Sequence, residues 1–534
     1  MKKIEFKDLV IYFEGEIYNK KNFSFDDEFL LLESLYLKYS FDFVSNLDGI
    51  FAFCIYDKVR KIYFCARDRF GNIPFFYTVK NGDFIFSSSI KDILNHLPIN
   101  ENLPKINKVA LSKYMQYFST FGEDTFYKDV YKLEEASYIV YENNKELFKK
   151  RYYKINTYKA VNDEISALKT LEELLYTSIE KRLISSPSTL LSGGVDSSLI
   201  SSIYTKLSGK KIDTFSIGYS EYKNYCELDY AKITSNHIAS NHHEIIIDKK
   251  TYIENFYSSL DNFDEPHADS AAIPLNILLK CVKDFGVNKL LSGEGADELF
   301  LGYDNYSKFL NYYNFRDSLR ENQFSFLDEI IGALQNNTKE SEYLRRVVKK
   351  QNIYNSFGEV FNDMQKRKLF VNVPTFKSEN PKKDAVDWMS YIDIKLWVAN
   401  PVLTKIYRVS KANSLQIHTP FLDNDILKYV FSVDSNIKIG NTNKYLLKKI
   451  AQKYIPNQII NRVKKGFNSP FNEWLQSEFG NSILETILEV NRQTQFFNEN
   501  YLKHIYTLAS SNKFKQHLYS LYIFSLWYKK TYLR

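Results

Sequence analysis

Apolar residues in the first part of the chain are spaced as in short β-strands. Apolar runs cover Leu9–Phe13, Ile50–Asp57 and Ile62–Ala66, and the last two are close enough to form a hairpin. Between the first two runs, Phe29–Tyr39 carries apolar residues at helical spacing. The pattern predicts a β-rich N-terminal region with an early helix.

Further along, strand and helix patterns alternate. Asp163–Leu183 has a helical pattern, and Thr189–Leu191 is a short β-type run that leads into another helical stretch. Ile212–Gly218 is a second β-type run, Asp229–His237 the next helix and His243–Ile247 a third strand. This order predicts a parallel sheet with right-handed crossovers and a ligand site at the carboxyl ends of its strands.

The stretch Ser192–Ser198, with the sequence Ser-Gly-Gly-Val-Asp-Ser-Ser, lies between the first of these strands and its helix. Its glycines let the backbone approach phosphates closely, and the hydroxyls of Ser192, Ser197 and Ser198 can donate to phosphate oxygens. Asp196 is an anion, so it suits Mg²⁺ bridged to a polyphosphate instead. No Lys follows the second Gly, which excludes a Walker A loop. The stretch resembles the pyrophosphate loop of N-type ATP pyrophosphatases, which form AMP.

A second turn of the same kind follows the predicted strand Asn288–Leu291. It covers Ser292–Phe300 and again combines Ser-Gly with carboxylates. Asp297 is placed to supply a second magnesium ligand opposite Asp196. The alternative, an ordinary polar turn that caps a helix, would have to occur twice with the same chemistry.

Composition is that of a soluble globular protein of two to three domains. The chain has 534 residues, of which 44% are hydrophobic and 25% charged. Its net charge of +7 is spread among mixed signs without a basic arm, so a nucleic-acid partner is not expected. The apolar run Leu518–Tyr528 is too short to span a membrane. Four cysteines without paired spacing and the lack of a signal-peptide pattern predict a cytoplasmic protein.

Four early segments resemble the glutamine-hydrolysing domain of asparagine synthetases: Gly15–Asn19, Leu47–Phe53, Ala66–Gly71 and Phe86–Lys91. The resemblance implies an N-terminal-nucleophile-hydrolase-like sandwich of two sheets between helices. In that family, the Cys that follows the initiator Met attacks glutamine. This chain has Lys2 there, and the family's opening segment is expected to be absent.

Other departures from the family pattern also affect this domain. The Asn that precedes the family's glycine, an oxyanion-hole donor, is Glu14 here, and a carboxylate would repel a developing oxyanion. The Lys and Glu of the later motifs are Ile73 and Ser89. We therefore expect residues 1–155 to form a truncated, inactive relic of the glutaminase domain.

The resemblance continues through Ser292–Phe300, Leu403–Leu415, Pro420–Asp423, Lys444–Lys448 and Arg462–Phe467. The region from Tyr303 to Val386 is helical and aromatic and matches no motif sharply. The expected fold is therefore an α+β sandwich followed, over residues 160–534, by an α/β parallel-sheet ATP pyrophosphatase domain with many helices.

The resemblance also assigns roles. It implies that Leu191, Ile217, Ser292 and Gly293 line the adenosine site. Glu294 takes the place of the glutamate that acts in ammonia addition. Lys464 falls where the family has a lysine that contacts the phosphate of the acyl-adenylate. The predicted nucleotide-binding set is Leu191, Ser192, Gly193, Gly194, Asp196, Ser197, Ser198, Ile217, Gly218, Ser292 and Gly293, with Asp196 and Asp297 as metal ligands.

Substitutions near the expected acceptor pocket leave its substrate open. Tyr407, Gln416 and His418 replace the family's Asp, Glu and Arg, and Lys411 replaces an apolar residue. These positions are expected close to the pocket or its supports. The carboxylate substrate is therefore predicted only as aspartate or a related acid.

The predicted function is an ATP- and Mg²⁺-dependent ligase that adenylates a small carboxylate, transfers ammonia or another amine, and releases AMP and pyrophosphate. Ammonia is free or supplied by an external partner, and a homodimer is an option. The alternatives are a lasso-peptide-cyclase-like macrocyclase or lactam synthetase, an amidotransferase of sugar uronic acids, and a non-catalytic scaffold. Glu294 argues against the β-lactam type, where a Tyr stands at this place.

Overall fold

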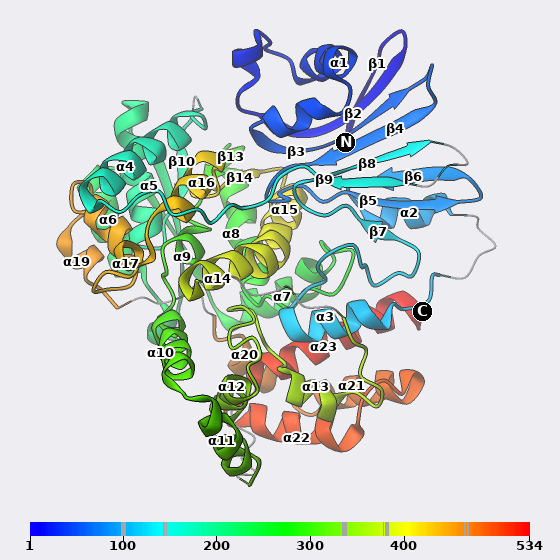
Figure 1. The fold of residues 1–534 in the computed structure, drawn as a ribbon, viewed down its shortest axis with the longest axis vertical. Coiled ribbons are helices and arrows are strands. Elements are labelled where there is room, and N and C mark those ends of the chain that lie inside the picture. Colours follow the sequence, from blue (N-terminus) through cyan, green and yellow to red (C-terminus); the bar gives the residue numbers. More distant parts are fainter. Residues whose placement is uncertain are drawn as a thin grey trace.

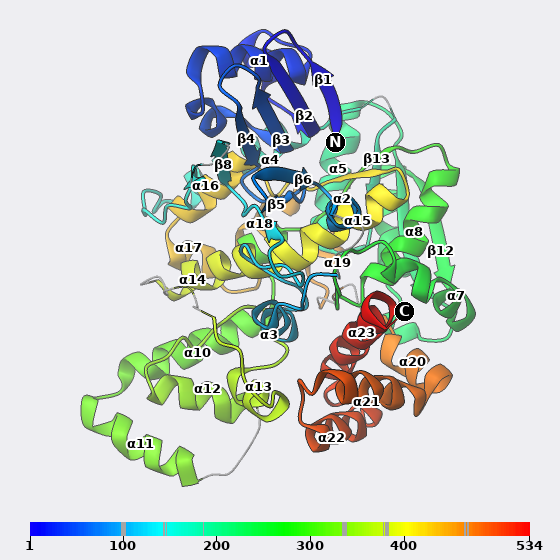
Figure 2. The ribbon, with the colours of Figure 1, turned by 90° about the vertical axis from the view of Figure 1, so that its right-hand side faces the viewer.

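The computed structural model describes residues 1–97, 103–142, 145, 147–184, 186–333, 339–376, 379, 384–463, 466 and 469–533 (Figure 1). Two antiparallel sheets form its N-terminal part, and Figures 1 and 2 place them at the top of the molecule. The strands of the six-stranded sheet, in spatial order, are β1 (Lys2–Glu5), β2 (Leu9–Ile17), β3 (Gly49–Asp57), β4 (Ile62–Arg67), β8 (Ser137–Glu142) and β9 (Phe148–Arg151). The three-stranded sheet contains β6 (Asp83–Ser87), β5 (Phe76–Lys80) and β7 (Tyr131–Lys132).

Alternation along β3 explains how this sheet packs on both faces. Phe51, Phe53 and Ile55 join the cluster under helix α1 (Glu28–Tyr39), whereas Ala52 and Cys54 join the cluster shared with the three-stranded sheet. Successive side chains of a strand point to opposite faces, so one apolar run serves two cores. The predicted hairpin and the helix are confirmed, whereas the exposed edge strand β1 lay outside the prediction.

Further helices complete this part of the chain. Short 3₁₀ turns η1 (Lys20–Phe23) and η2 (Asp42–Asn46) flank α1. Helices α2 (Ile90–His96) and α3 (Lys108–Tyr117) lead toward the second part of the molecule.

A five-stranded parallel sheet forms the centre of the second part. Its strands, in spatial order, are β12 (Asn241–Ile247), β11 (Asp213–Tyr219), β10 (Ser188–Leu190), β13 (Lys289–Leu291) and β14 (Gln416–His418). The chain crosses from β10 to β11 and β12, then returns to the other side of β10 as β13. The loops after β10 and β13 therefore diverge at a topological switch point, where ligands bind in open α/β sheets. The predicted parallel sheet is confirmed.

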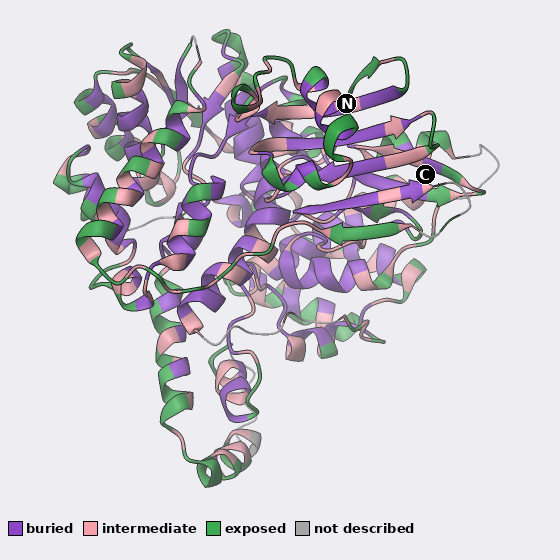
Figure 3. Cartoon of the chain, turned by 45° about the horizontal axis from the view of Figure 1, so that its top comes forward, coloured by how far each residue is buried: buried purple, intermediate pink, exposed green. Residues whose placement is uncertain are grey.

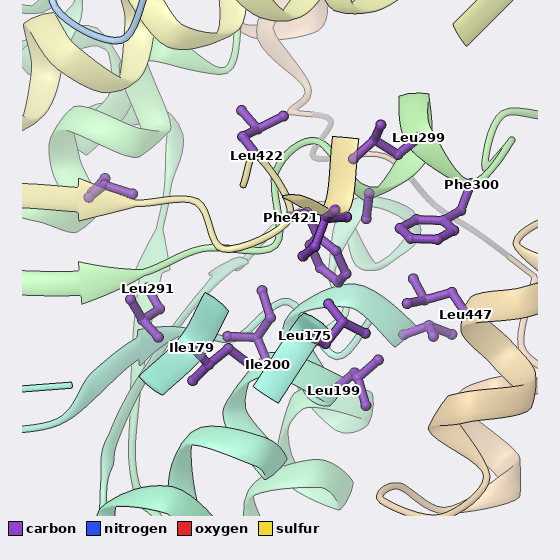
Figure 4. Packing of buried hydrophobic residues seen from close by; sticks show 14 of the residues in the cluster. Leu175, Ile179, Leu199, Ile200, Leu291, Leu299, Phe300, Phe421, Leu422 and Leu447 are labelled. Carbon is purple, nitrogen blue, oxygen red and sulfur yellow. The ribbon is translucent and has the colours of Figure 1, made fainter. Parts of the chain in front are cut away.

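Helices cover both faces of this sheet (Figure 1). Those between Val161 and Val287, with the 3₁₀ turn, are α4 (Glu164–Glu180), α5 (Val195–Ser208), η3 (Lys223–Tyr225), α6 (Leu228–Ile238), α7 (Lys249–Leu260) and α8 (Ala272–Asp284). Figure 4 shows part of the resulting core. Leu175 of α4, Leu199 of α5 and Leu291 of β13 belong to the same cluster, which also includes Phe421 and Leu447. Apolar burial of this extent is the main stabilising contribution to a domain.

The segment from Tyr303 onward forms a projecting helical arm, which occupies the lower left of Figure 2 and has many exposed positions in Figure 3. Its elements are α10 (Asp304–Ser318), α11 (Glu321–Ala333), α12 (Lys339–Val348) and α13 (Asp363–Leu369). A separate aromatic cluster that includes Tyr306, Phe309, Tyr354 and Trp388 holds its base. The predicted helical character of this region is confirmed.

One long helical run crosses the middle of the molecule. Helix α14 (Ala385–Ile392) continues through the π-helical segment Asp393–Val402 into α15 (Leu403–Ala412). Pro401 lies in the π-helical segment and cannot donate a backbone hydrogen bond, which disfavours regular α-helix there. The run carries α15 from the helical arm to the contact between the two parts of the chain.

The remaining helices complete the second part. They are α9 (Ala296–Leu299), α16 (Asn424–Ser432), α17 (Ser435–Ile439), α18 (Tyr445–Ala451), α19 (Asn457–Ile460), α20 (Phe471–Phe479), α21 (Ser482–Thr494), α22 (Glu499–Ser510) and α23 (Lys515–Tyr532). Apolar residues of α23 pack with α3, α7 and α21 in one core. Among the described residues, no helix is long and apolar enough to cross a membrane.

Candidate active site

The two predicted phosphate turns meet at the carboxyl ends of β10 and β13. A Cβ on Gly293 would lie 2.9 Å from the Ser197 nitrogen and 3.0 Å from the Asp196 Cβ, so the approach of the turns requires glycine there. Helix α5 begins within the first turn, at Val195, with Gly194 as its N-cap. The free backbone N–H groups of such a helix end favour an anion.

A cavity of about 480 Å³ opens at this point. Both turns line it, together with Ile217 of β11, Lys405 of α15 and Lys444 next to α18. The volume lies in the usual range of small-molecule sites.

Lys444 joins the two turns electrostatically. Its Nζ bonds Asp196 Oδ2 and lies 2.6 Å from Asp297 Oδ1, and its side chain is only 6% exposed. Burial by itself would lower the pKa of Lys444, but the two carboxylates raise it above its ordinary value. The ammonium group therefore stays charged and offsets the repulsion between the two aspartates.

The local backbone makes room for this bridge. A Cβ on Gly302 would lie 2.0 Å from Asp297 Oδ1 and 2.3 Å from Lys444 Cε. Lys444 itself has a φ of 57°, in the left-handed region that non-glycine residues adopt rarely. Local strain of this kind concentrates at functional sites.

A second carboxyl group lies directly behind Asp297. Glu298 is buried and accepts a hydrogen bond of 2.5 Å from the Tyr303 hydroxyl. Burial, and then the charge of Asp297, raise the pKa of Glu298 above its usual range. The Glu298 carboxyl therefore favours its neutral form, which limits the repulsion between Glu298 and Asp297.

A further group of charges lies where α15 meets the cavity. Lys405 Nζ donates to Asp269 Oδ2 at 2.7 Å, and the lysine is 5% exposed. Burial by itself would lower its pKa, but Asp269 and then Glu294 raise it above the ordinary value. Lys405 thus places a charged ammonium in the same cavity lining as the predicted catalytic glutamate.

The structure brings most of the predicted site residues to this cavity. Those in its lining are Leu191, Ser192, Gly194, Asp196, Ser197, Ile217, Ser292, Gly293, Glu294 and Asp297. Lys464, the predicted catalytic lysine, lies outside the described residues.

Three predicted nucleotide-binding residues do not line the cavity. Ser198 is fully buried and its hydroxyl pairs with Thr234 at 2.9 Å, so its predicted role as a phosphate donor is corrected to a packing role between α5 and α6. The Gly193 carbonyl accepts from Arg462, and Gly218 packs against Leu228. Ser198 is buried because it lies inside α5, on a helix whose apolar side faces the core.

The substituted positions near the expected acceptor pocket also fall elsewhere. Tyr407 and Lys411 contact Glu14 of the N-terminal part, and His418 Nδ1 pairs with the Tyr18 hydroxyl at 2.9 Å. Neither these residues nor Gln416 is in the cavity lining that the structure describes. Tyr407, Lys411 and His418 lie instead at the contact between the two parts of the chain, so a place in the pocket wall is not found, whereas a role as supports of the pocket stays a prediction.

Sequence reasoning missed the two buried lysines of the site. Lys444 belongs to a segment that matched the family pattern, but no role followed from that match. The signal that could have found it is the need for a cation between two turn carboxylates. Lys405 gave no comparable signal, because its partner Asp269 lies 136 positions away in the sequence.

Sheet, helix end, paired turns and charged cavity together define a nucleotide-binding α/β enzyme. A family model described as asparagine synthase matches residues 170–529, and one described as glutamine amidotransferase domain matches residues 3–153. The chain belongs to the asparagine synthase family and is an ATP-dependent, amide-forming ligase.

Several curated relatives are similar over long stretches. Glutamine-hydrolysing asparagine synthetase 1 of Bacillus subtilis is 28% identical over 97% of this chain and 85% of its own length. A putative asparagine synthetase 2 of Methanocaldococcus jannaschii is 34% identical over 55% of this chain and 59% of its own. A putative asparagine synthetase of Mycobacterium tuberculosis is 26% identical over 88% and 76%, respectively.

Replacing Lys444 should weaken nucleotide binding. In Lys444→Met the two carboxylates lose their shared cation and repel a triphosphate, so ATP affinity in Mg²⁺ buffer should fall by about tenfold or more. Calorimetric titration measures this affinity. Lys449→Met is the matched control, because Lys449 is an exposed lysine of α18, the helix that Lys444 directly precedes, and it should bind ATP like the unaltered protein. Equal affinity of the Lys444 variant would contradict the assigned role.

Proposed function

We propose that the chain adenylates the carboxylate of a small acid and transfers ammonia to it, with AMP and pyrophosphate as the other products. The observation that carries this proposal is the pair of turn carboxylates, Asp196 and Asp297, which share Lys444 across one cavity. Pyrophosphate release needs positive charge near the β- and γ-phosphates. Lys444 contributes one such charge, and the two carboxylates suit Mg²⁺, which would contribute more.

Asp196 and Asp297 also suit Mg²⁺ by their chemistry. Magnesium binds hard oxygen ligands and commonly uses one or two carboxylates together with substrate phosphates. Within the described part of the chain, no group of three or more His, Cys, Asp or Glu side chains could hold a metal ion. Coordination would therefore have to be completed by ATP. When bound, the ion would neutralise charge on the departing pyrophosphate.

In the first step, an oxygen of the substrate carboxylate attacks the α-phosphorus of ATP, and the bond to pyrophosphate breaks. Ser192, Gly194 and Ser197 line the cavity, and the amides at the start of α5 and the two serine hydroxyls would bind phosphate oxygens. Leu191 and Ile217 would contact the adenosine, with Ser292 and Gly293 on its other side.

In the second step, the nitrogen of ammonia attacks the acyl carbon and the bond to AMP breaks. Glu294 would accept a proton from the attacking nitrogen. Lys405 would hold a carboxylate of the substrate or stabilise the oxyanion, since it is a buried charged donor in the cavity lining that also contains Glu294. We retain Lys464 as a candidate for the phosphate of the acyl-adenylate.

Aspartate or a related acid is the proposed carboxylate. The curated relatives carry asparagine synthetase names, and Lys405 offers a cation for a second carboxylate of such an acid. The macrocyclase and uronic-acid alternatives use the same adenylation chemistry with other acceptors.

For residues 1–155 we propose a hydrolase-like sandwich without glutaminase activity, followed by a ligase domain over residues 160–534. Glu14 occupies the expected position of an oxyanion donor, where a negative charge would raise the barrier to glutamine hydrolysis. Cys54 and Cys65, the cysteines of this region, are fully buried within β3 and β4. Nitrogen would enter as free ammonia or from a partner protein.

The nucleotide products test the first step. Incubation with ATP, Mg²⁺, ammonium and a mixture of acids that includes aspartate should yield AMP and pyrophosphate, which ³¹P NMR resolves. Asp196→Asn should reduce pyrophosphate release by about 100-fold or more, because a carboxylate ligand for Mg²⁺ is lost. ADP and inorganic phosphate as products would refute the adenylation proposal.

Glu294 is tested by separating the two steps. If it serves amine addition, Glu294→Gln should slow amide formation much more than carboxylate-dependent exchange of labelled pyrophosphate into ATP. Equal losses in both reactions would show that Glu294 has a structural or metal-binding role instead.

The nitrogen source is tested with labelled glutamine. We expect ammonium to support amide formation and glutamine to yield no glutamate above background, with or without ATP, because an ionised Glu14 opposes an oxyanion. Ammonium serves as the positive control in the same assay. Stoichiometric glutamate release by the purified chain would overturn this reading of the N-terminal domain.

A further inference from the structure

Helix α15 presents two rows of charged or hydroxyl-bearing side chains to two different neighbours. Lys405 and Arg408, three positions apart, contact the loop that contains Asp264 and Asp269. Tyr407 and Lys411, four positions apart, contact the N-terminal domain. Residues three or four positions apart share a helix face, so one short helix connects the ligase cavity to that domain.

Glu14 of β2 is the centre of the second contact. The Tyr407 hydroxyl and Lys411 Nζ each donate to Glu14 Oε1 at 2.7 Å, and the Ser88 hydroxyl donates to Oε2 at 3.0 Å. Lys411 also donates to the Tyr407 hydroxyl at 2.5 Å and to Ser88 at 3.2 Å. We call Glu14, Ser88, Tyr407 and Lys411 the clasp.

The clasp consists largely of residues that depart from the family pattern. Glu14, Tyr407 and Lys411 each replace a residue of a different chemical class, and the structure brings these three replacements into one hydrogen-bonded group. Burial by itself would raise the pKa of Glu14, but the Lys411 ion pair and the Tyr407 hydrogen bond lower it to about 2. The carboxylate is therefore charged throughout the neutral range and keeps its partners.

Asp264 forms a second link between the same elements. It accepts from the Ser89 hydroxyl and the Ile90 backbone nitrogen, both at 2.9 Å, at the start of α2. It also pairs with Arg408 of α15. All of these partners are buried or nearly so, and α15 is thus held to the N-terminal domain at two places.

We propose that the N-terminal domain has a positioning function in the ligase reaction, in which Glu14 holds α15 so that Lys405 keeps its place in the cavity lining that also contains Glu294. Lys411 and Lys405 are separated by about 9 Å along the helix axis, at about 1.5 Å per residue. A shift of α15 at the clasp is therefore transmitted to Lys405 by a rigid element. The kinetic part of this inference rests on the proposed ligase function, whereas the anchoring of α15 does not.

Hydrogen–deuterium exchange of the whole protein tests the anchoring without any substrate. Glu14→Gln and Lys411→Met should each speed exchange in peptides from residues 403–412 by about tenfold, because the end of the helix loses its partner. Glu14→Gln combined with Lys411→Met should match either single variant within about twofold, since each single variant already removes the Glu14–Lys411 ion pair. Unchanged exchange in α15 would overturn the proposal.

The control is Glu5→Gln. Glu5 lies on the neighbouring strand β1 and pairs with Lys58 at 2.9 Å, so the variant removes a similar charge from the same sheet. Exchange in residues 403–412 should be unaffected there. If exchange in residues 403–412 rose in Glu5→Gln as it does in Glu14→Gln, the N-terminal domain would be loosened in general. That result would contradict a specific role for Glu14.

Steady-state kinetics test the link to Lys405. In Glu14→Gln the KM for the carboxylate substrate should rise by about tenfold while the KM for ATP changes by less than about twofold, because only α15 moves. If exchange in α15 became faster but both KM values rose equally, or neither rose, the positioning role would be overturned. If the unaltered protein had no ligase activity but the variants showed the predicted exchange pattern, the proposed function would be refuted. The anchoring of α15 would still stand.

Discussion

The ligase site depends on one buried ammonium group between two carboxylates. Asp196 and Asp297 come from different turns at the switch point of the sheet, and without a cation they would repel each other in a poorly hydrated cavity. Lys444 resolves this conflict, and its own burial is tolerated because it has both partners. The constraint extends to the surrounding chain, since Gly302 leaves space for the bridge and Lys444 adopts a left-handed backbone.

The N-terminal domain and the ligase domain meet around α15. This helix contributes Lys405 to the cavity. Its Tyr407 and Lys411 contact the N-terminal domain, and its Arg408 pairs with Asp264, which also contacts that domain. If the N-terminal domain has no glutaminase activity, as proposed, it could be lost without cost unless it served another purpose. The clasp supplies a physical reason for such a domain to remain attached to the ligase.

Local patterns in the sequence were sufficient for much of the fold. The apolar runs Ile50–Asp57 and Ile62–Ala66 predicted the β3–β4 hairpin, and the strand–helix order around Ser192–Ser198 predicted the parallel sheet. The two turns and their carboxylates were found for the same reason. Lys405 and Lys444 were missed because their partners lie far away in the sequence, and Ser198 was misassigned because a loop motif does not reveal where the helix begins.

The central claim, that a carboxylate is adenylated at the Lys444 site, has a direct isotopic test. The protein is incubated with ATP, Mg²⁺, ammonium and acids labelled with ¹⁸O in the carboxylate, beginning with aspartate, and AMP is analysed by mass spectrometry. The account predicts that one ¹⁸O atom passes into AMP for each amide formed. Amide formation with unlabelled AMP, or ¹⁸O in inorganic phosphate together with ADP, would contradict it.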